Sequence, residues 1–271
     1  MSGVGKFPDF ACPHCHGVVP WPARDAPEAV CTGCGAHYGN SGRFVDMLGG
    51  APKRRTPAQW AMEWAPLVGI YESRFWRRSP MFMLATGIAF DRELAVVRRA
   101  LGLRGGETIL DIACGTGIYT RPLAGSLHDG VAVGLDLSPA MLEYAAGVTG
   151  SDANTNLRFV RASALEVPFA NDTFDAVTCC AALHLMPDVP RVLAQMSRVL
   201  RPGGRVALAV FRSEPGAFGS FVSDARRRAL GIDSFRPEKL EAWLGTAGFE
   251  AVEFPYEGWT WMIAGARLAT G

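Results

Sequence analysis

Apolar runs alternate with amphipathic stretches along the chain from about residue 107 to residue 212. Two patterns of helical period begin at residues suited to N-capping, Ser138 and Asp188. The apolar runs have the length of buried strands and fall near 107–112, 131–136, 157–160, 173–180 and 205–212, with helical patterns between them near 117–126, 138–147 and 188–201. This alternation predicts an α/β domain built on a parallel sheet.

The last part of the chain departs from this alternation. A helix is expected at 236–247, with Gly248 as its stop. Two strands near 249–256 and 259–267 then follow, separated only by a short turn. Because so short a connection joins antiparallel strands, we expect the final strand to run against its neighbour.

Four cysteines near the start form two C-x2-C pairs, Cys12 with Cys15 and Cys31 with Cys34. Two knuckles at this spacing can supply four thiolates to one tetrahedral zinc ion, and a glycine follows each pair closely, as tight knuckle turns require. Four cysteines complete the ligand shell, so the metal is expected to be structural. Two disulfides or a redox-active pair are the alternatives.

Two acidic residues stand at the ends of apolar runs that are expected to be neighbouring strands. Residues 109–117 read ILDIACGTG, which places Asp111 just before Gly115 and Gly117, and the next run ends in Asp136. Open α/β sheets bind ligands at the carboxyl ends of their strands, and glycines allow the backbone to approach a ligand closely. One carboxylate can accept from both hydroxyls of a ribose, so the pattern predicts a nucleoside site.

The spacing of the glycines separates two classes of nucleoside cofactor. A dinucleotide fingerprint, G-x-G-x-x-G, needs a third glycine where this chain has Thr120. Asp111 would repel a pyrophosphate but attract the ammonium group of a methionine moiety. The pattern therefore favours S-adenosylmethionine.

At this point the chain resembles the class I S-adenosylmethionine-dependent methyltransferases, over roughly residues 60 to 271. LDIACGTG is similar to their first motif, and three further motifs follow in order at 134–145, 161–177 and 199–210. The resemblance implies a Rossmann-like, seven-stranded, mostly parallel sheet with a reversed last strand. It implies a cofactor site made by Asp111, Ala113, Gly115, Gly117, Asp136, Leu137, Met141, Ser163 and Ala164.

Ser163 departs from the family's pattern. The family usually has an aspartate at this position for the adenine amino group, whereas this chain has Ser163 between two alanines. A serine hydroxyl can accept the same hydrogen bond without charge assistance.

Residues 51–105 are expected to form a linker and a helical cap. Aromatic and apolar side chains recur there at helical spacing, for which ordinary core packing is the simpler explanation. In this architecture the segment before the first strand commonly folds over the cofactor face. Tyr71, Trp76, Met81 and Phe82 are accordingly our candidates for the lining of an acceptor pocket.

His184 is the histidine expected nearest to the site. It follows the fourth strand of the sheet, in the stretch CCAALHLMPD, and a base of near-neutral pKa suits a phenol or enol acceptor. The alternative is that His184 fixes a loop or packs beside the cofactor.

Charge separates two classes of acceptor. A zinc ribbon followed by this fold resembles bacterial ribosomal RNA guanine methyltransferases, but also a group near the ubiquinone and menaquinone enzymes. Residues 1–50 carry 3 basic and 4 acidic residues, residues 51–105 carry 10 and 4, and the whole chain has a net charge of only +1. The acidic ribbon is a poor match for a phosphate backbone, although the basic segment leaves RNA as an alternative.

Together these features predict a methyltransferase that acts on a hydrophobic or aromatic small molecule, such as a quinone, phenol, polyketide or other specialised metabolite. RNA guanine methylation is the second hypothesis, and a cofactor-binding scaffold without turnover is the third. We expect a zinc ribbon at 1–50, the linker and cap at 51–105 and the cofactor-binding domain at 106–271. No signal peptide and no run of about 18 apolar residues is seen, which predicts a cytoplasmic protein without a membrane span. The sequence does not indicate an oligomeric state.

Overall fold

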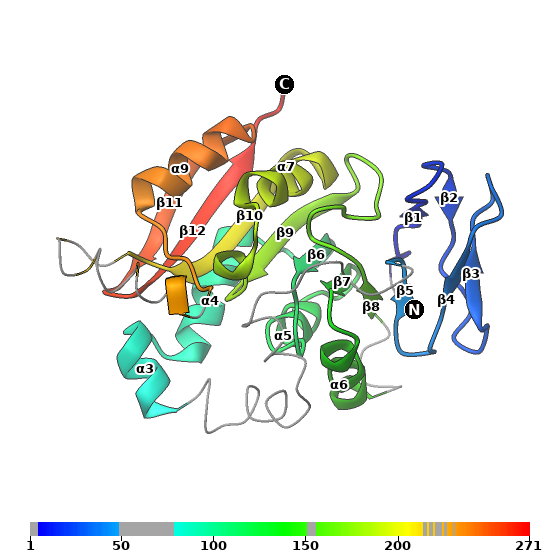
Figure 1. Cartoon of the computed structure of the whole chain (residues 1–271), viewed down its shortest axis with the longest axis horizontal. Coiled ribbons are helices and arrows are strands. Elements are labelled where there is room, and N and C mark those ends of the chain that lie inside the picture. The colour runs from blue at the N-terminus through cyan, green and yellow to red at the C-terminus, as the bar shows by residue number, and fades with distance from the viewer. Residues whose placement is uncertain are drawn as a thin grey trace.

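The computed structural model describes residues 5–48, 79–150, 156–213 and 231–271, with positions 216, 219, 224 and 227–229 in between. Within these residues a central sheet is covered by helices on both faces, and a small ribbon lies beside one edge of the sheet (Figure 1).

The central sheet has the strand order β11-β12-β10-β9-β6-β7-β8-β5. Neighbouring strands from β10 through β5 run parallel, whereas β12 is antiparallel to both β10 and β11. The predicted parallel sheet with a reversed last strand is therefore confirmed. Its main strands are β6 (Thr108–Ile112), β7 (Val131–Asp136), β8 (Leu157–Arg161), β9 (Phe174–Cys180), β10 (Leu200–Phe211), β11 (Phe249–Glu257) and β12 (Trp261–Leu268).

The prediction of seven strands was wrong, because an eighth strand, β5 (Val45–Asp46), is added beside β8. Two residues are too few to show a strand period, and the pairing spans more than a hundred residues of chain. A tertiary contact holds β5 in place: Arg161 Nη1 donates to Asp46 Oδ2 at 2.6 Å.

The helices begin and end where local chemistry dictates. Ser138 Oγ accepts from the amide of Met141 and Asp188 Oδ1 from that of Arg191, so both predicted N-caps are confirmed. The helix predicted at 117–126 covers only Thr120–Ala124. Its start is later than predicted because Gly117 has a φ of 77°, which is outside the α-helical region. The helices are α3 (Pro80–Thr86), α4 (Phe90–Leu101), α5 (Thr120–Ala124), α6 (Pro139–Thr149), α7 (Val189–Val199) and α9 (Pro237–Thr246), with a 3-10 turn, η1 (Leu183–Leu185).

Two hydrophobic cores lie on opposite faces of the sheet. Helices α4, α5 and α6 pack on one face, and α7 and α9 pack on the other. The second of these cores continues into the ribbon, where Phe10 stacks on Phe169 with ring centroids 5.3 Å apart. The ribbon is therefore packed onto the sheet.

The ribbon consists of two short antiparallel hairpins. One pairs β1 (Phe10–Ala11) with β2 (Val18–Val19), and the other pairs β3 (Glu28–Val30) with β4 (His37–Gly39). Each hairpin presents one C-x2-C pair at its turn.

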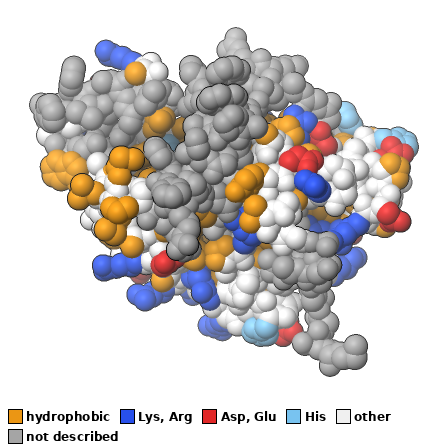
Figure 2. Space-filling model, turned by 90° about the horizontal axis from the view of Figure 1, so that it is seen from below, with side chains coloured by type: hydrophobic (Ala, Val, Ile, Leu, Met, Phe, Trp, Pro, Cys, Tyr) orange, Lys and Arg blue, Asp and Glu red, His pale blue; other side chains and the backbone are white. Residues whose placement is uncertain are grey.

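Hydrophobic side chains are exposed around α3. Met81, Met83 and Leu84 are 63%, 47% and 86% exposed, and Trp259 is 67% exposed in the turn between β11 and β12. Figure 2 shows hydrophobic side chains gathered on the α3 side of the molecule.

Among the described residues, none of the helices has the length and apolar character needed to cross a membrane.

Candidate functional site

The predicted cofactor residues meet at the carboxyl edge of β6, β7 and β8. Asp111 lies in β6, Asp136 ends β7, and Ser163 follows the end of β8. Parallel pairing puts Asp111 beside Gly134 and Asp136 beside Arg161, so these strand ends share one edge. This is the edge at which open α/β sheets bind ligands.

The loop after β6 has an unusual backbone. Ala113, Gly115 and Gly117 all have positive φ, at 56°, 54° and 77°. The left-handed conformation costs an alanine about 1 kcal/mol, and such strain is concentrated at ligand-binding sites. Main-chain bonds pin the turn, with Cys114 N donating to Leu135 O at 3.0 Å.

Gly134 is a residue of this site that the sequence reasoning missed. A Cβ at this position would lie 2.7 Å from the Phe159 ring and 3.0 Å from Cys114 Sγ. Strand β7 therefore cannot carry a side chain at this position, because Cys114 of the loop after β6 and the Phe159 ring pack against it here. The signal was present, since a glycine stands inside an otherwise apolar strand.

Asp136 ties the loop to the start of α6. Its Oδ2 accepts from the amide of Gly115 and its Oδ1 from the amide of Ser138, both at 2.8 Å. Each carboxylate oxygen has a second lone pair, so both can also accept from a ligand hydroxyl. The residue that was predicted to bind a ribose thus also shapes the loop around it.

Asp111 is buried, with 3% of its surface exposed, and accepts from Thr120 Oγ1 at 2.6 Å. Burial raises the pKa of this carboxyl to about 7, and the charge of Asp136 raises it further, against the opposing hydrogen bond from Thr120. A cationic group placed beside Asp111 would favour its ionised form.

The remaining predicted cofactor residues surround the same edge. Met141 and Ala164 are buried, and Leu137 is half-buried, with its carbonyl accepting from Arg161 Nε at 3.2 Å. Ser163 Oγ accepts from the amide of Leu165 at 3.2 Å, which orders the turn after β8. The roles of all these residues in cofactor binding stay predictions.

Aromatic side chains cluster at the neighbouring part of the edge, where β9 and β10 end and β12 begins. The His184 ring lies 4.6 Å from that of Phe211 and 6.1 Å from that of Trp261, and Phe82 lies 6.5 Å from Trp261. His184 is 4% exposed, and its carbonyl accepts from the amide of Asp233 at 2.8 Å. It therefore packs within the aromatic cluster and holds a loop, and its role as a base stays a prediction.

A buried carboxyl beneath this cluster was not found from the sequence. Glu93 Oε1 accepts from Tyr119 Oη at 2.5 Å and from Trp261 Nε1 at 3.0 Å. Glu93 lies in α4, within the segment predicted to form the helical cap, and is fully buried. The hydrogen bond from Trp261 joins β12 to α4 beneath the cluster, and the hydrogen bond from Tyr119 holds the same carboxyl in place.

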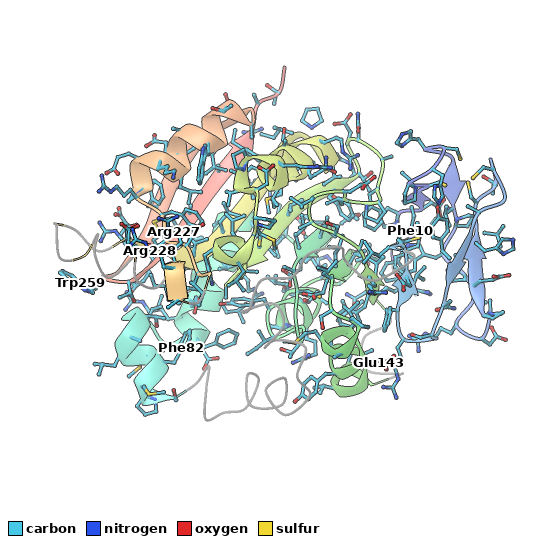
Figure 3. The ribbon with its side chains drawn as sticks, in the orientation of Figure 1. Phe10, Phe82, Glu143, Arg227, Arg228 and Trp259 are labelled. Atoms are coloured by element: carbon cyan, nitrogen blue, oxygen red, sulfur yellow. The ribbon has the colours of Figure 1, made fainter. Side chains whose placement is uncertain are left out.

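The structure describes two of the four residues predicted to line an acceptor pocket, Met81 and Phe82. Tyr71 and Trp76 lie outside the described residues. Phe82 reaches from α3 toward the sheet, whereas Trp259 lies at the outer rim (Figure 3). Met81 is 63% exposed.

The four cysteines of the ribbon come together. Their Sγ atoms all lie within 4.8 Å of one another, with Cys12 to Cys34 at 3.7 Å and Cys15 to Cys31 at 3.5 Å. A zinc ion with bonds of about 2.3 Å sets tetrahedral sulfur–sulfur edges of about 3.8 Å, so the four thiols fit this ion. All four are free thiols here.

The two knuckles make the same turn with different residues. His16 and Gly35 have φ of 60° and 72°, and their amides donate to the carbonyls of Cys12 and Cys31. The left-handed position of the first knuckle is thus a histidine, contrary to the expected glycine. Gly17 serves another purpose, because a Cβ there would lie 3.1 Å from Cys15 Sγ.

Comparisons with known proteins agree with this geometry. Residues 109–204 match the family described as "Methyltransferase domain". The chain is 40% identical to a demethylmenaquinone methyltransferase of Lactococcus lactis over 113 residues, which are 41% of this chain and 45% of the relative. It is 33% identical to the 27-O-demethylrifamycin SV methyltransferase of Amycolatopsis mediterranei over 170 residues, 59% of this chain and 62% of the relative.

The fold is also found among solved structures. A phosphoethanolamine N-methyltransferase of Haemonchus contortus superposes with a TM-score of 0.66 at 17% identity, over 80% of this chain and 61% of that one. Residues 109–204 thus match a methyltransferase domain, and this match and the named methyltransferase relatives support an enzyme, while the solved structures show the fold. The matches span 45% and 62% of the two curated relatives described above.

Proposed function

We propose that the protein transfers a methyl group from S-adenosylmethionine to a hydrophobic or aromatic small molecule, of the quinone, phenol or polyketide kind. The observation that carries the proposal is the juxtaposition, along one sheet edge, of a glycine loop flanked by two carboxylates and a cluster of aromatic rings. The first arrangement suits a nucleoside with a cationic methionine part, and the second suits a flat apolar acceptor.

Each part of the edge has a distinct task in this proposal. Asp136 would hold the ribose, Asp111 the ammonium group, and the amides of the loop after β6 the carboxylate of the methionine part. Methyl transfer is an in-line displacement from sulfonium to a nucleophile, so positioning and exclusion of water supply much of the rate. His184, beside Phe211 and Trp261, would accept the proton of a phenol or enol acceptor.

The named relatives support the acceptor class. One is named for a demethylated menaquinone and the other for a demethylated rifamycin. The aromatic cluster of this chain is formed by Phe82, His184, Phe211 and Trp261. His184 and Trp261 are buried, so the partly exposed rings of Phe82 and Phe211 are the ones that could contact such molecules.

We also propose that the ribbon holds a structural zinc ion through Cys12, Cys15, Cys31 and Cys34. The ion would fix the relative position of the two hairpins, and its four thiolates leave no position for a substrate. Metal analysis of the purified protein should give about one zinc per chain. Substitution of Cys34 by serine should release it, and metal-free protein of native stability would contradict the proposal.

A panel of acceptors tests the proposed function. The protein is incubated with S-adenosylmethionine and a demethylated quinol, a catechol or a phenolic polyketide, and S-adenosylhomocysteine is measured. Turnover on at least one is expected, and His184→Gln should lower kcat by about a hundredfold while cofactor affinity stays unchanged. If the cofactor binds but no acceptor is methylated, the acceptor class is wrong.

A further inference from the structure

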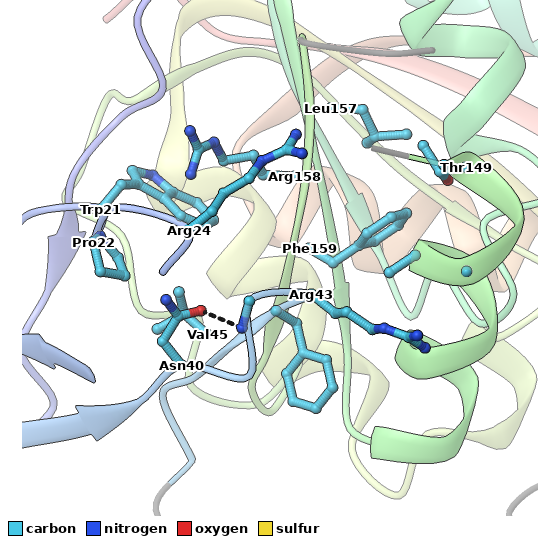
Figure 4. A pocket seen from close by; sticks show the side chains of 15 residues that line it. Trp21, Pro22, Arg24, Asn40, Arg43, Val45, Thr149, Leu157, Arg158 and Phe159 are labelled. Carbon is cyan, nitrogen blue, oxygen red and sulfur yellow. Dashed lines mark hydrogen bonds between the residues drawn. The ribbon is translucent and has the colours of Figure 1, made fainter. Parts of the chain in front are cut away.

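The ribbon joins the central sheet at the strand end beside the predicted nucleoside site. Strand β5 pairs with β8 only at Val160 and Arg161, the last two residues of β8. Beside the first residues of β8, the ribbon leaves a cavity of about 300 Å³ instead (Figure 4). In the described part of the chain, the strand pairing between ribbon and sheet is therefore confined to the carboxyl end of β8.

A row of paired residues crosses three strands at this end of the sheet. Asp136, which ends β7, is paired with Arg161, which ends β8, and Arg161 is paired in turn with Asp46, which ends β5. The amide of Ala162 donates to the carbonyl of Asp136 at 3.1 Å, and the amide of Met47 donates to that of Arg161 at 2.9 Å. One arginine thus separates the acid that is predicted to bind the ribose from an acid of the ribbon.

The side chain of Arg161 connects the ribbon to the turn after β7. Its Nη1 donates to Asp46 Oδ2 at 2.6 Å, and its Nε donates to the carbonyl of Leu137 at 3.2 Å. Only 11% of the Arg161 side chain and 28% of the Asp46 side chain are exposed. Because a guanidinium is planar and its donors have fixed directions, the bond to Asp46 helps to set the direction of Nε.

The peptide that receives this hydrogen bond also orients the Asp136 carboxylate. The carbonyl of Leu137 and the amide of Ser138 belong to one planar peptide unit. That amide donates to Asp136 Oδ1 at 2.8 Å. Arg161 therefore holds one end of the peptide whose other end holds the carboxylate, so a turn of this peptide would move the carboxylate.

Asp46 is also fixed from the ribbon side. Its Oδ1 accepts from the amide of Leu48 at 3.0 Å, so its two oxygens have different partners. Strand β5 forms a bridge to Asn40, which follows β4, and Tyr38 of β4 has its Oη 3.1 Å from Cys12 Sγ. The fold of the ribbon around its cysteines thus determines where Asp46 lies.

We infer that Asp46 is a positioning residue of the cofactor site, and that the ribbon raises the affinity for S-adenosylmethionine through it. Asp46 holds Arg161, Arg161 holds the peptide between Leu137 and Ser138, and this peptide holds the Asp136 carboxylate in the direction of the ribose. Because these groups are already ordered before the cofactor arrives, binding costs less conformational entropy. The inference rests on the proposed cofactor site and is independent of the identity of the acceptor.

A second ion pair between the ribbon and the central domain provides a matched control. Arg43 Nη1 donates to Glu143 Oε2 at 2.9 Å, and Figure 4 shows the Arg43 side chain reaching toward α6. Glu143 lies within α6, five residues beyond its N-cap at Ser138. Loss of this pair also removes a link between ribbon and domain, but leaves the chain of contacts through Arg161 intact.

Calorimetric titration of the full, zinc-replete chain with S-adenosylhomocysteine tests the inference. Asp46→Asn should weaken binding by about fivefold or more, although the residue touches no cofactor atom. Arg43→Ala should leave the affinity within about twofold. Because Asp46 acts through Arg161, the double variant Asp46→Asn with Arg161→Gln should bind as Arg161→Gln alone does, within about twofold.

Loss of stability alone would give a different pattern. Phe10→Leu removes the ring that packs on Phe169, so it should lower the midpoint of thermal unfolding and leave the affinity unchanged. Each variant is titrated well below its midpoint, after its zinc content has been measured.

The possible results separate this inference from the proposed function. Unchanged affinity in Asp46→Asn, additive effects in the double variant, or equal losses in the two controls would overturn the inference and leave the proposed function standing. If the native protein does not bind S-adenosylhomocysteine, the proposed function is wrong and the inference is overturned with it.

Discussion

At the scale of single residues, Asp136 has two tasks that compete for one side chain. Both of its oxygens accept main-chain amides, from Gly115 and Ser138, while facing the edge where a ribose is expected. The sequence indicated the second task, because an acid at the end of the second strand is a local pattern. The first depends on where the loop after β6 folds, which no spacing rule specifies.

Replacement of Asp136 should disturb both tasks. Asp136→Ala is expected to weaken S-adenosylmethionine binding by more than about 1 kcal/mol, because hydrogen bonds to a charged group are lost. Calorimetric titration measures the change. Asp129→Ala, which removes an exposed carboxylate on another turn, should leave the affinity within about twofold. Equal affinity of Asp136→Ala and the native protein for S-adenosylmethionine would contradict the placement of Asp136 in the cofactor site.

The buried Asp111 links stability to pH. Its carboxyl loses its proton near pH 3.8 when unfolded and near pH 7 when folded, so between these values the folded state binds more protons. The free energy of unfolding should therefore fall as pH rises through this window, by up to about 4 kcal/mol from this group. Urea unfolding of the cofactor-free protein at several pH values measures it, and Asp111→Asn should show a flatter profile.

Cofactor binding should respond to the same proton. A bound ammonium group favours ionised Asp111, so affinity for S-adenosylmethionine should rise as pH increases from about 6 to 8, with proton release on binding. If the affinity of Asp111→Asn for S-adenosylmethionine rises as steeply with pH as that of the native protein, another group is responsible for the pH dependence.

At the scale of elements, β5 shows what periodicity cannot predict. The long strands and amphipathic helices repeat their patterns several times, and their positions followed from the sequence. Strand β5 is two residues long and is fixed by a partner, Arg161, that lies far away in the chain. Its pairing depends on contacts that form only in the tertiary structure, so the number of strands predicted from the sequence was one too low.

The ion pair that docks β5 should matter more than a surface pair. Arg161 has 11% and Asp46 28% of its side chain exposed, so loss of the arginine leaves a poorly solvated carboxylate. Arg161→Ala is expected to lower the free energy of unfolding by about 3 kcal/mol, as measured in urea. Arg43→Ala, whose pair with Glu143 is about half exposed, should cost less than about 1 kcal/mol. Similar costs for the two would mean that β5 is held by its backbone alone.

At the scale of the whole molecule, the ribbon and the sheet share one hydrophobic core. Phe10, Val19 and Tyr38 of the ribbon belong to the same buried cluster as Leu110 of β6. The sequence shows a cysteine-rich segment poor in apolar residues and therefore suggests a separate appendage. Which of its few apolar side chains face the sheet cannot be read from their spacing, because its strands are only two or three residues long.

Removal of zinc should consequently affect the entire chain. Chelation is expected to lower the midpoint of thermal unfolding of the ribbon and the sheet together, in one transition. Circular dichroism reports the sheet domain, and the fluorescence of Trp21 in a variant without the other tryptophans reports the ribbon. Two separate transitions, with that of the sheet unchanged, would show that the ribbon unfolds independently.

The short strand β5 also has a consequence for the solubility of the chain. It pairs with the last two residues of β8, a strand with the sequence LRFVR, and so covers part of an edge to which another molecule's strand could add. A shortened protein beginning at residue 51 would keep the methyltransferase motifs but present this edge bare. Such a protein is expected to self-associate more than the full chain through edge-to-edge pairing, which size-exclusion chromatography of the two proteins would measure.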